Sequence, residues 1–82
     1  MNLGQYELYM KRVEDAQQWY YQSEQQYNSL RTAVADAALA GEPITDELKD
    51  AVASAKQDMR LAQELFIDAK AEMIATIERI QL

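Results

Sequence analysis

Few side chains in this sequence could take part in chemistry, and the most regular group among them is a series of three carboxylates. Glu64, Asp68 and Glu72 follow one another at intervals of four residues. On a helix this spacing places carboxylates on one face, where their oxygens could hold a divalent cation. A di-iron site of the helical-bundle type would also need Glu-x-x-His pairs, and the sequence contains no His. The spacing therefore favours a solvated acidic face over a metal site.

The other residue types argue against most kinds of active site. Without His and Cys, the chain lacks the commonest general base and the thiol nucleophile. Its two glycines, Gly4 and Gly41, cannot form a glycine-rich phosphate loop. The sequence therefore predicts a protein that is not an enzyme and that holds no cofactor and no metal.

A heptad pattern of apolar and small residues predicts the elements that carry all other side chains. In the first half of the chain, alternating steps of three and four residues predict a helix from about 5 to 40. Its heptad positions are Tyr6, Tyr9, Val13, Ala16, Tyr20, Ser23, Tyr27, Leu30, Val34 and Ala37. After an interruption, the same alternation predicts a second helix from about 46 to 81. Its heptad positions are Leu48, Val52, Ala55, Met59, Ala62, Phe66, Ala69, Met73, Thr76 and Ile80.

The interruption contains residues that end one helix and begin another. Gly41 suits the left-handed conformation that closes a helix, and Pro43 cannot continue one. Thr45 is expected to cap the second helix at its N-terminus. Asp46 and Glu47 would then lie in the first turn, where the helix dipole favours negative charge.

A short connector, residues 41–45, makes the two helices antiparallel neighbours. The predicted fold class is all-α: a single domain, residues 1–82, folded as an antiparallel coiled-coil-like hairpin. Each heptad contributes two residues to this pattern. The first of the two is large, whereas the second is Ala, Ser or Thr in most heptads. Because antiparallel helices set first positions against second positions, large side chains can face small ones. Two registers satisfy this rule, one with Tyr27 opposite Ala62 and the other with Tyr27 opposite Ala55.

The chain carries more apolar side chains than a single contact between two helices can cover. A helical pair is thin, and small domains are marginally stable even when they are compact. We expect a second chain to bury the excess, most simply in a homodimer that forms a four-helix bundle; a different protein partner could cover the same surface. Trp19 and Tyr21 flank the heptad positions on opposite sides, so at least one of them is expected to meet another chain. The expected interaction residues are Trp19, Tyr21, Met10, Leu61, Leu65, Ile67, Ile74 and Ile77, and the excess also includes Leu3, Leu8 and Leu82.

Charge narrows the class of partner. Fourteen acidic and eight basic residues give a net charge of -6, which disfavours direct binding to nucleic acid. The basic residues are dispersed among acidic ones without forming a basic stripe, and Glu7 is placed to pair with Lys11. The sequence has neither a signal-like N-terminus nor a run of about 18 uncharged apolar residues, so we expect no membrane association and a cytoplasmic location.

In outline, a helical hairpin of this length resembles the needle subunits of type III secretion systems and the small chaperones that hold them. Needle subunits usually carry a Pro-x-x-Pro turn, whereas the segment Gly41-Glu42-Pro43-Ile44 contains a single proline. The resemblance covers the two helices and rests on no motif.

The sequence thus predicts a non-enzymatic interaction or assembly protein, such as an adaptor, a chaperone-like protein or a structural subunit. It would act by self-association and through apolar helix faces. The alternative is a small acidic inhibitor, of the kind that phages encode. Such an inhibitor would imitate the spacing of phosphates and occupy the binding groove of an enzyme or a nucleic-acid-binding protein.

Overall fold

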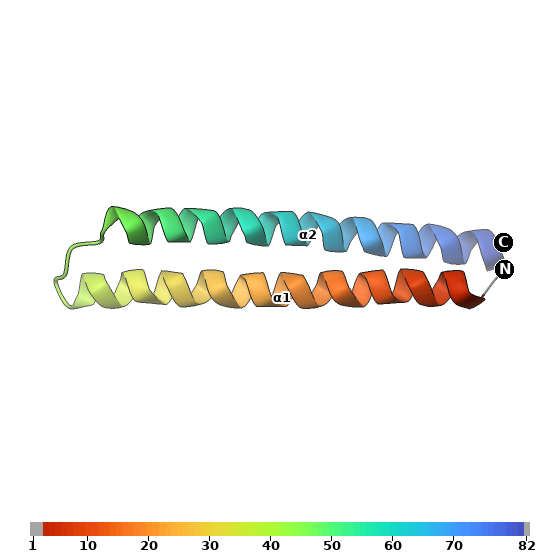
Figure 1. The fold of residues 1–82 in the computed structure, drawn as a ribbon, viewed down its shortest axis with the longest axis horizontal. Coiled ribbons are helices and arrows are strands. Elements are labelled where there is room, and N and C mark those ends of the chain that lie inside the picture. Colours follow the sequence, from red (N-terminus) through yellow and green to blue (C-terminus); the bar gives the residue numbers. More distant parts are fainter. Residues whose placement is uncertain (1–2, 82) are drawn as a thin grey trace.

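Two long helices lie side by side and make up nearly all of the structure (Figure 1). The structure is a computed structural model, and it describes residues 3–81. Helix α1 spans Leu3–Leu39 and helix α2 spans Asp46–Gln81. The helices are antiparallel, and together they form a rod of 60 × 16 × 13 Å. The predicted helical hairpin is confirmed, while Leu82 lies outside the described residues.

A glycine just beyond the end of α1 closes this helix, as the sequence predicts. Gly41 has a φ of 70°, a conformation that costs other L-residues free energy because of their Cβ atom. Two hydrogen bonds close the last turn: the Glu42 N–H donates to the Ala37 carbonyl at 2.9 Å, and the Gly41 N–H donates to the Ala38 carbonyl at 3.2 Å. This pair of bonds is the Schellman motif, which satisfies carbonyl groups that have no partner within the helix.

Helix α2 begins with the cap that the sequence predicts. The Thr45 hydroxyl accepts a hydrogen bond from the Leu48 N–H at 3.1 Å, and the Thr45 carbonyl accepts the first helical bond, from the Lys49 N–H. Asp46 lies in the first turn beside Lys49, with 3.9 Å between the two charged groups. The hydroxyl thus satisfies one free N–H group, and the acidic side chain lies near the positive end of the helix dipole.

The heptad positions form the contact between the helices. Every heptad position predicted in α1 is buried or half-buried, and so is every one in α2 except Ile80. Ile80 is 44% exposed, because it lies near the end of α2, beside the first residues of α1. The most enclosed side chains are small ones, namely Ser23, Ala55, Ala62 and Thr76. Small residues at these positions let the two backbones approach each other.

A contact between two aromatic rings selects one of the two possible registers. Side chains on a helix lean toward its N-terminus, so those of antiparallel helices lean in opposite directions. The rings of Tyr20 and Phe66 meet with centroids 6.1 Å apart. For the two rings to meet, Phe66 must lie level with a residue of α1 that precedes Tyr20, that is, at the same height along the rod. This is the case when Tyr27 is opposite Ala55, but not when Tyr27 is opposite Ala62.

The ends of the helices and an ion pair agree with this register. At the connector end, α1 extends beyond the start of α2 (Figure 1). The Tyr27–Ala55 register produces this overhang, whereas the alternative would make α2 the longer helix at that end. Arg12 reaches Glu72 at 3.4 Å, and Glu72 is level with Met10, so these two side chains also lean toward each other.

The hairpin leaves much of its apolar surface open to solvent. Within residues 3–81, no large side chain is fully buried. The accessible surface of 6263 Å² is roughly a quarter larger than the ~5000 Å² expected for a compact protein of 9.4 kDa. The difference exceeds the ~800 Å² that one partner contributes to a protein interface of standard size. The shape of the molecule therefore leaves enough surface for a further contact.

Candidate interaction surfaces

Most of the side chains predicted to interact with another chain are exposed. Exposed fractions range from 38% at Met10 to 55% at Tyr21, and only Ile77 is half-buried. The other exposed members of the predicted set are Trp19, Leu61, Leu65, Ile67 and Ile74. These residues do not form one surface, since their heptad positions divide them between the two sides of the contact between α1 and α2.

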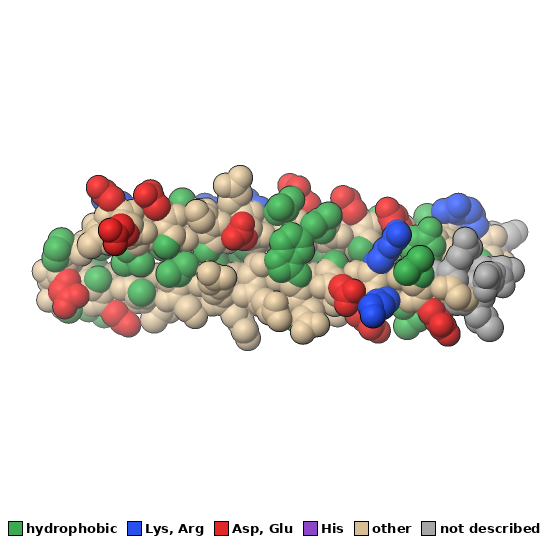
Figure 2. Space-filling view, in the orientation of Figure 1, with side chains coloured by type: hydrophobic (Ala, Val, Ile, Leu, Met, Phe, Trp, Pro, Cys, Tyr) green, Lys and Arg blue, Asp and Glu red, His purple; other side chains and the backbone are tan. Residues whose placement is uncertain are grey.

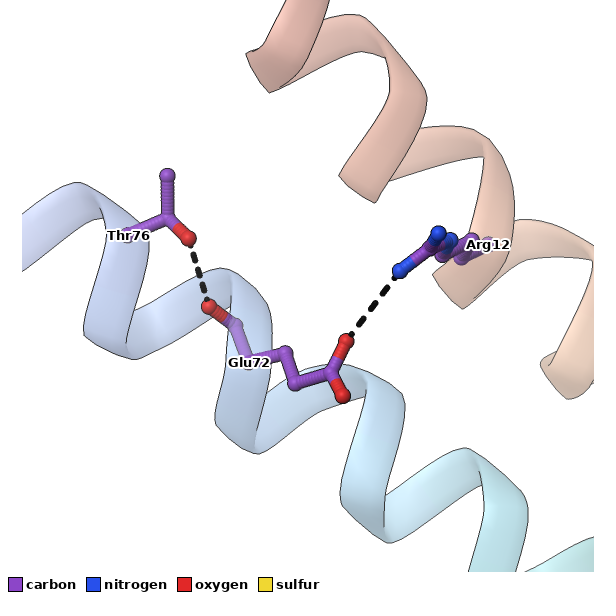
Figure 3. Close-up of polar contacts among 3 residues, drawn as sticks. All are labelled: Arg12, Glu72 and Thr76. Carbon is purple, nitrogen blue, oxygen red and sulfur yellow. Dashed lines mark hydrogen bonds and ion pairs between the residues drawn. The ribbon is translucent and has the colours of Figure 1, made fainter.

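An ion pair between the helices identifies one of these sides. Arg12 Nη1 donates to Glu72 Oε2 across the hairpin (Figure 3). On α2, the Thr76 hydroxyl donates to the backbone carbonyl of Glu72 at 2.8 Å, one turn away. Both charged side chains are more than half exposed, so the pair adds little to stability. The pair nevertheless shows which face of α1 lies on the same side of the hairpin as which face of α2, because Arg12 and Glu72 occupy equivalent heptad positions.

The Trp19 flank consists of Trp19, Leu61 and Leu65 together with the surface around the Arg12–Glu72 pair. Trp19 follows Arg12 by seven residues and Leu65 precedes Glu72 by seven, so both lie on the side of the ion pair. Trp19 is level with Gln63, which places it between the two leucines. Figure 2 shows this side of the molecule, with apolar side chains of both helices gathered midway along the rod. Leu8, which is 51% exposed, lies farther along the same flank.

The Ile74 flank, on the opposite side, consists of Met10, Tyr21, Ile67, Ile74 and Ile77. On α1, this flank includes Gln17, whose amide donates a hydrogen bond to the Tyr21 hydroxyl at 3.2 Å. On α2, this flank includes Lys70, whose ammonium lies 4.5 Å from the centroid of the Phe66 ring. Ile67, Ile74 and Ile77 surround Lys70 at intervals of three, four and seven residues. Trp19 and Tyr21 therefore belong to different surfaces, as their spacing predicts.

Charge is divided between the flanks of α2. Its cations Lys49, Lys56, Arg60 and Lys70 occupy the heptad positions of the Ile74 flank, with Asp46 as the single acidic residue there. The Trp19 flank and the outer face of α2 carry seven acidic residues and one cation. The acidic residues are Glu47, Asp50, Asp58, Glu64, Asp68, Glu72 and Glu78, and the cation is Arg79. The order of residues along the chain does not reveal this division of charge, but their heptad positions do.

The groups considered for chemistry do not gather into a site. Glu72 binds Arg12 rather than lying free beside Glu64 and Asp68. Within residues 3–81, no three acidic side chains are arranged to hold a metal ion. Two shallow depressions lie on α1, one lined by Glu7, Met10, Lys11, Glu14 and Asp15, and the other by Asn28, Arg31, Thr32 and Ala35. The spacing of Glu7 and Lys11 suggested an ion pair, but in the described part of the chain only Arg12–Glu72 and Asp46–Lys49 lie within ion-pair distance.

Comparisons with other proteins add no family. No family model matches the chain, and neither a characterised protein nor a solved structure is significantly similar to it. Within the described residues, neither α1 nor α2 has a segment that is long and apolar enough to cross a membrane. The two flanks are therefore the features from which a function must be argued.

Proposed function

We propose that this chain is a non-enzymatic assembly protein that acts by self-association through its exposed helix flanks. The observation that supports the proposal is the distribution of apolar surface. Ten large apolar side chains are at least 38% exposed, while no large side chain within residues 3–81 is fully buried. Exposed apolar surface of this extent on a small rod favours contact with further protein.

The assembly we propose is a homodimer in which the Ile74 flanks of two copies face each other. A twofold axis parallel to the helices keeps every residue at its own level and places α2 of one copy along α1 of the other. All neighbouring helices are then antiparallel, as in a four-helix bundle. Ile74 and Met10 lie within one turn of the same level, so the isoleucines of one copy pack near Met10 of the other.

Charges on the Ile74 flank complement one another in this arrangement. Glu24 is level with Asp58, so Lys56 and Arg60 of the second copy lie on either side of it. Lys70 comes close to Glu14 of the second copy in the same way. None of these residues takes part in the ion pairs within the described chain, which are Arg12–Glu72 and Asp46–Lys49. Their charges are therefore available for contacts between copies.

The Trp19 flank is a poorer surface for contact between copies. Besides the acidic residues of α2, it carries Asp15 and Asp36 of α1, and its cations are Arg12 and Arg79. Two such flanks packed together would bring carboxylates against carboxylates, which costs free energy in a desolvated contact. Self-association is therefore expected to use the Ile74 flank.

Molar mass tests this proposal, measured by light scattering over a range of concentrations. We expect the native chain to be a dimer, and Ile67→Lys or Ile74→Lys to yield monomers that keep part of their helicity. Leu65→Lys is the matched control, because it places the same charge on the opposite flank and should leave the dimer intact. A monomeric native chain, or dimers of unchanged affinity for both isoleucine variants, would disprove the proposal.

A further inference from the structure

The Trp19 flank is a second surface, separate from the one assigned to self-association, and its chemistry indicates what it binds. Trp19, Leu61 and Leu65 are 39%, 50% and 43% exposed. In the register described above, Trp19 lies opposite the residue midway between the two leucines, so the three exposed side chains belong to one apolar patch that spans both helices. Figure 2 shows apolar side chains gathered midway along the rod. A partly exposed Trp within such a patch is the residue type that most often dominates binding energy at interfaces.

Acidic side chains border the patch along α2. Asp58 precedes Leu61 by three residues, and Asp68 follows Leu65 by three, so a carboxylate lies about one helical turn beyond each leucine. On α1, Asp15 lies one turn before Trp19. Arg12, a cation on the same flank, is already paired with Glu72. Figure 2 shows acidic groups on α2 toward both ends from the central apolar cluster.

We propose that the Trp19 flank binds a basic amphipathic helix of another protein. Two apolar side chains one turn apart on such a helix would pack against Trp19, Leu61 and Leu65. Lys or Arg residues about one turn beyond them would meet Asp58 and Asp68. Nucleic acids and anionic membranes are negatively charged, as are the acidic side chains that border the patch, so these side chains repel them. A second copy of this chain presents the same acidic border on this flank and is excluded for the same reason.

Trp19 itself reports on the binding, since it is the single tryptophan of the chain. The probe is a synthetic amphipathic helix of Lys and Leu without aromatic residues, and its control is the same peptide with Glu in place of Lys. We expect the Lys–Leu peptide to shift the emission of Trp19 to shorter wavelength in a saturable manner, with an affinity that falls as salt is raised. The Glu–Leu peptide should bind at least about tenfold more weakly.

Variants of the native chain separate this flank from the other one. Asp58→Asn combined with Asp68→Asn should weaken binding of the Lys–Leu peptide about tenfold, and Leu61→Gln combined with Leu65→Gln should abolish the shift. Ile74→Gln is the matched control on the opposite flank and should leave the peptide affinity unchanged. Circular dichroism of each variant confirms that the helices persist.

The outcomes distinguish this proposal from self-association. An unshifted Trp19 emission, equal affinities for the two peptides, or equal losses in Leu61→Gln/Leu65→Gln and Ile74→Gln would each overturn the proposed docking surface. Molar mass measured on the same samples tests the homodimer independently. A chain that is monomeric but still binds the Lys–Leu peptide through the Trp19 flank would refute the dimer and support the docking surface.

Discussion

At the scale of single residues, the structure depends on a few positions at the connector. Gly41 adopts a φ of 70°, and a Cβ atom built there would meet nothing within 4 Å. Space is therefore available for a side chain, and only the backbone conformation opposes one. Thr45 caps α2 through a single hydrogen bond of 3.1 Å to the Leu48 N–H. These two residues set where the hairpin turns, so their replacement should change stability without changing the flanks.

Gly41→Ala should lower the free energy of unfolding by about 1 kcal/mol, because alanine is strained in the left-handed conformation. Urea denaturation at a fixed chain concentration measures the effect. Gly41→Asn should be less destabilising, since Asn visits this conformation more readily than Ala does. An alanine variant with the native midpoint would show that the turn does not require this backbone conformation.

Thr45→Ala should cost about 1 kcal/mol of stability, because the Leu48 N–H loses the hydroxyl that accepts its hydrogen bond. Thr45→Ser keeps an oxygen at the same position and should remain within a few tenths of a kcal/mol of the native chain. The same denaturation experiment compares the three proteins. Equal stabilities for the alanine and serine variants would contradict the role assigned to the cap.

At the scale of the elements, packing rests on small residues that allow close approach of α1 and α2. Ala62 is 0% exposed and Ala55 is 4% exposed, and the aromatic rings of Tyr20 and Phe66 meet in the same contact between the helices. The lean of the side chains toward the N-terminus of each helix then selects the register with Tyr27 opposite Ala55. Register in turn determines which apolar residues lie level with one another, and so it defines both flanks.

Cysteine pairs can test the register, because the native chain contains no Cys. A chain with Tyr27→Cys and Ala55→Cys should oxidise readily to an intramolecular disulfide. In a chain with Tyr27→Cys and Ala62→Cys, the second cysteine is displaced by seven residues, about 10 Å along the helix, which is beyond disulfide reach. Non-reducing electrophoresis separates the cross-linked monomer from disulfide-linked dimers. Preferential cross-linking of the second chain would mean that the register is wrong.

At the scale of the whole molecule, an elongated rod presents two surfaces of different chemistry. The Ile74 flank combines apolar residues with charges of both signs, whereas the Trp19 flank combines apolar residues with mainly acidic ones. The first composition is compatible with a second copy of itself and the second is not. Exposed apolar residues alone would not distinguish the two flanks, so our proposal of a different partner for each flank rests on the distribution of charge.

Charge reversal should reveal contacts between copies. Glu14→Lys places two cations near each other at the proposed contact with Lys70, and Lys70→Glu places two anions there, so each variant alone should dimerise more weakly than the native chain. Mixing the two variants should restore association, because each mixed dimer pairs opposite charges at both contacts. Pairing of residues 14 and 70 within one chain would not be restored by mixing. Sedimentation of the separate and mixed samples measures the effect.

The sequence by itself determined the helices and their ends. Heptad spacing, Gly41 and Thr45 act over a few residues, so they can be interpreted without knowledge of distant contacts, and the structure confirms them. Ile80 is the one heptad position that is exposed instead of buried or half-buried, because it follows the spacing but lies at the end of the contact between the helices.

The register and the grouping of the exposed apolar residues were decided only by the tertiary structure. Both possible registers place large residues opposite small ones, so residue size cannot choose between them. The choice comes from the Tyr20–Phe66 and Arg12–Glu72 contacts, which bring together residues far apart in the sequence. Those contacts also align Trp19 with Leu61 and Leu65, whereas the separation of Trp19 from Tyr21 already follows from their spacing on one helix. Spacing along one helix specifies a face of that helix, but only packing against the second helix makes two faces into one surface.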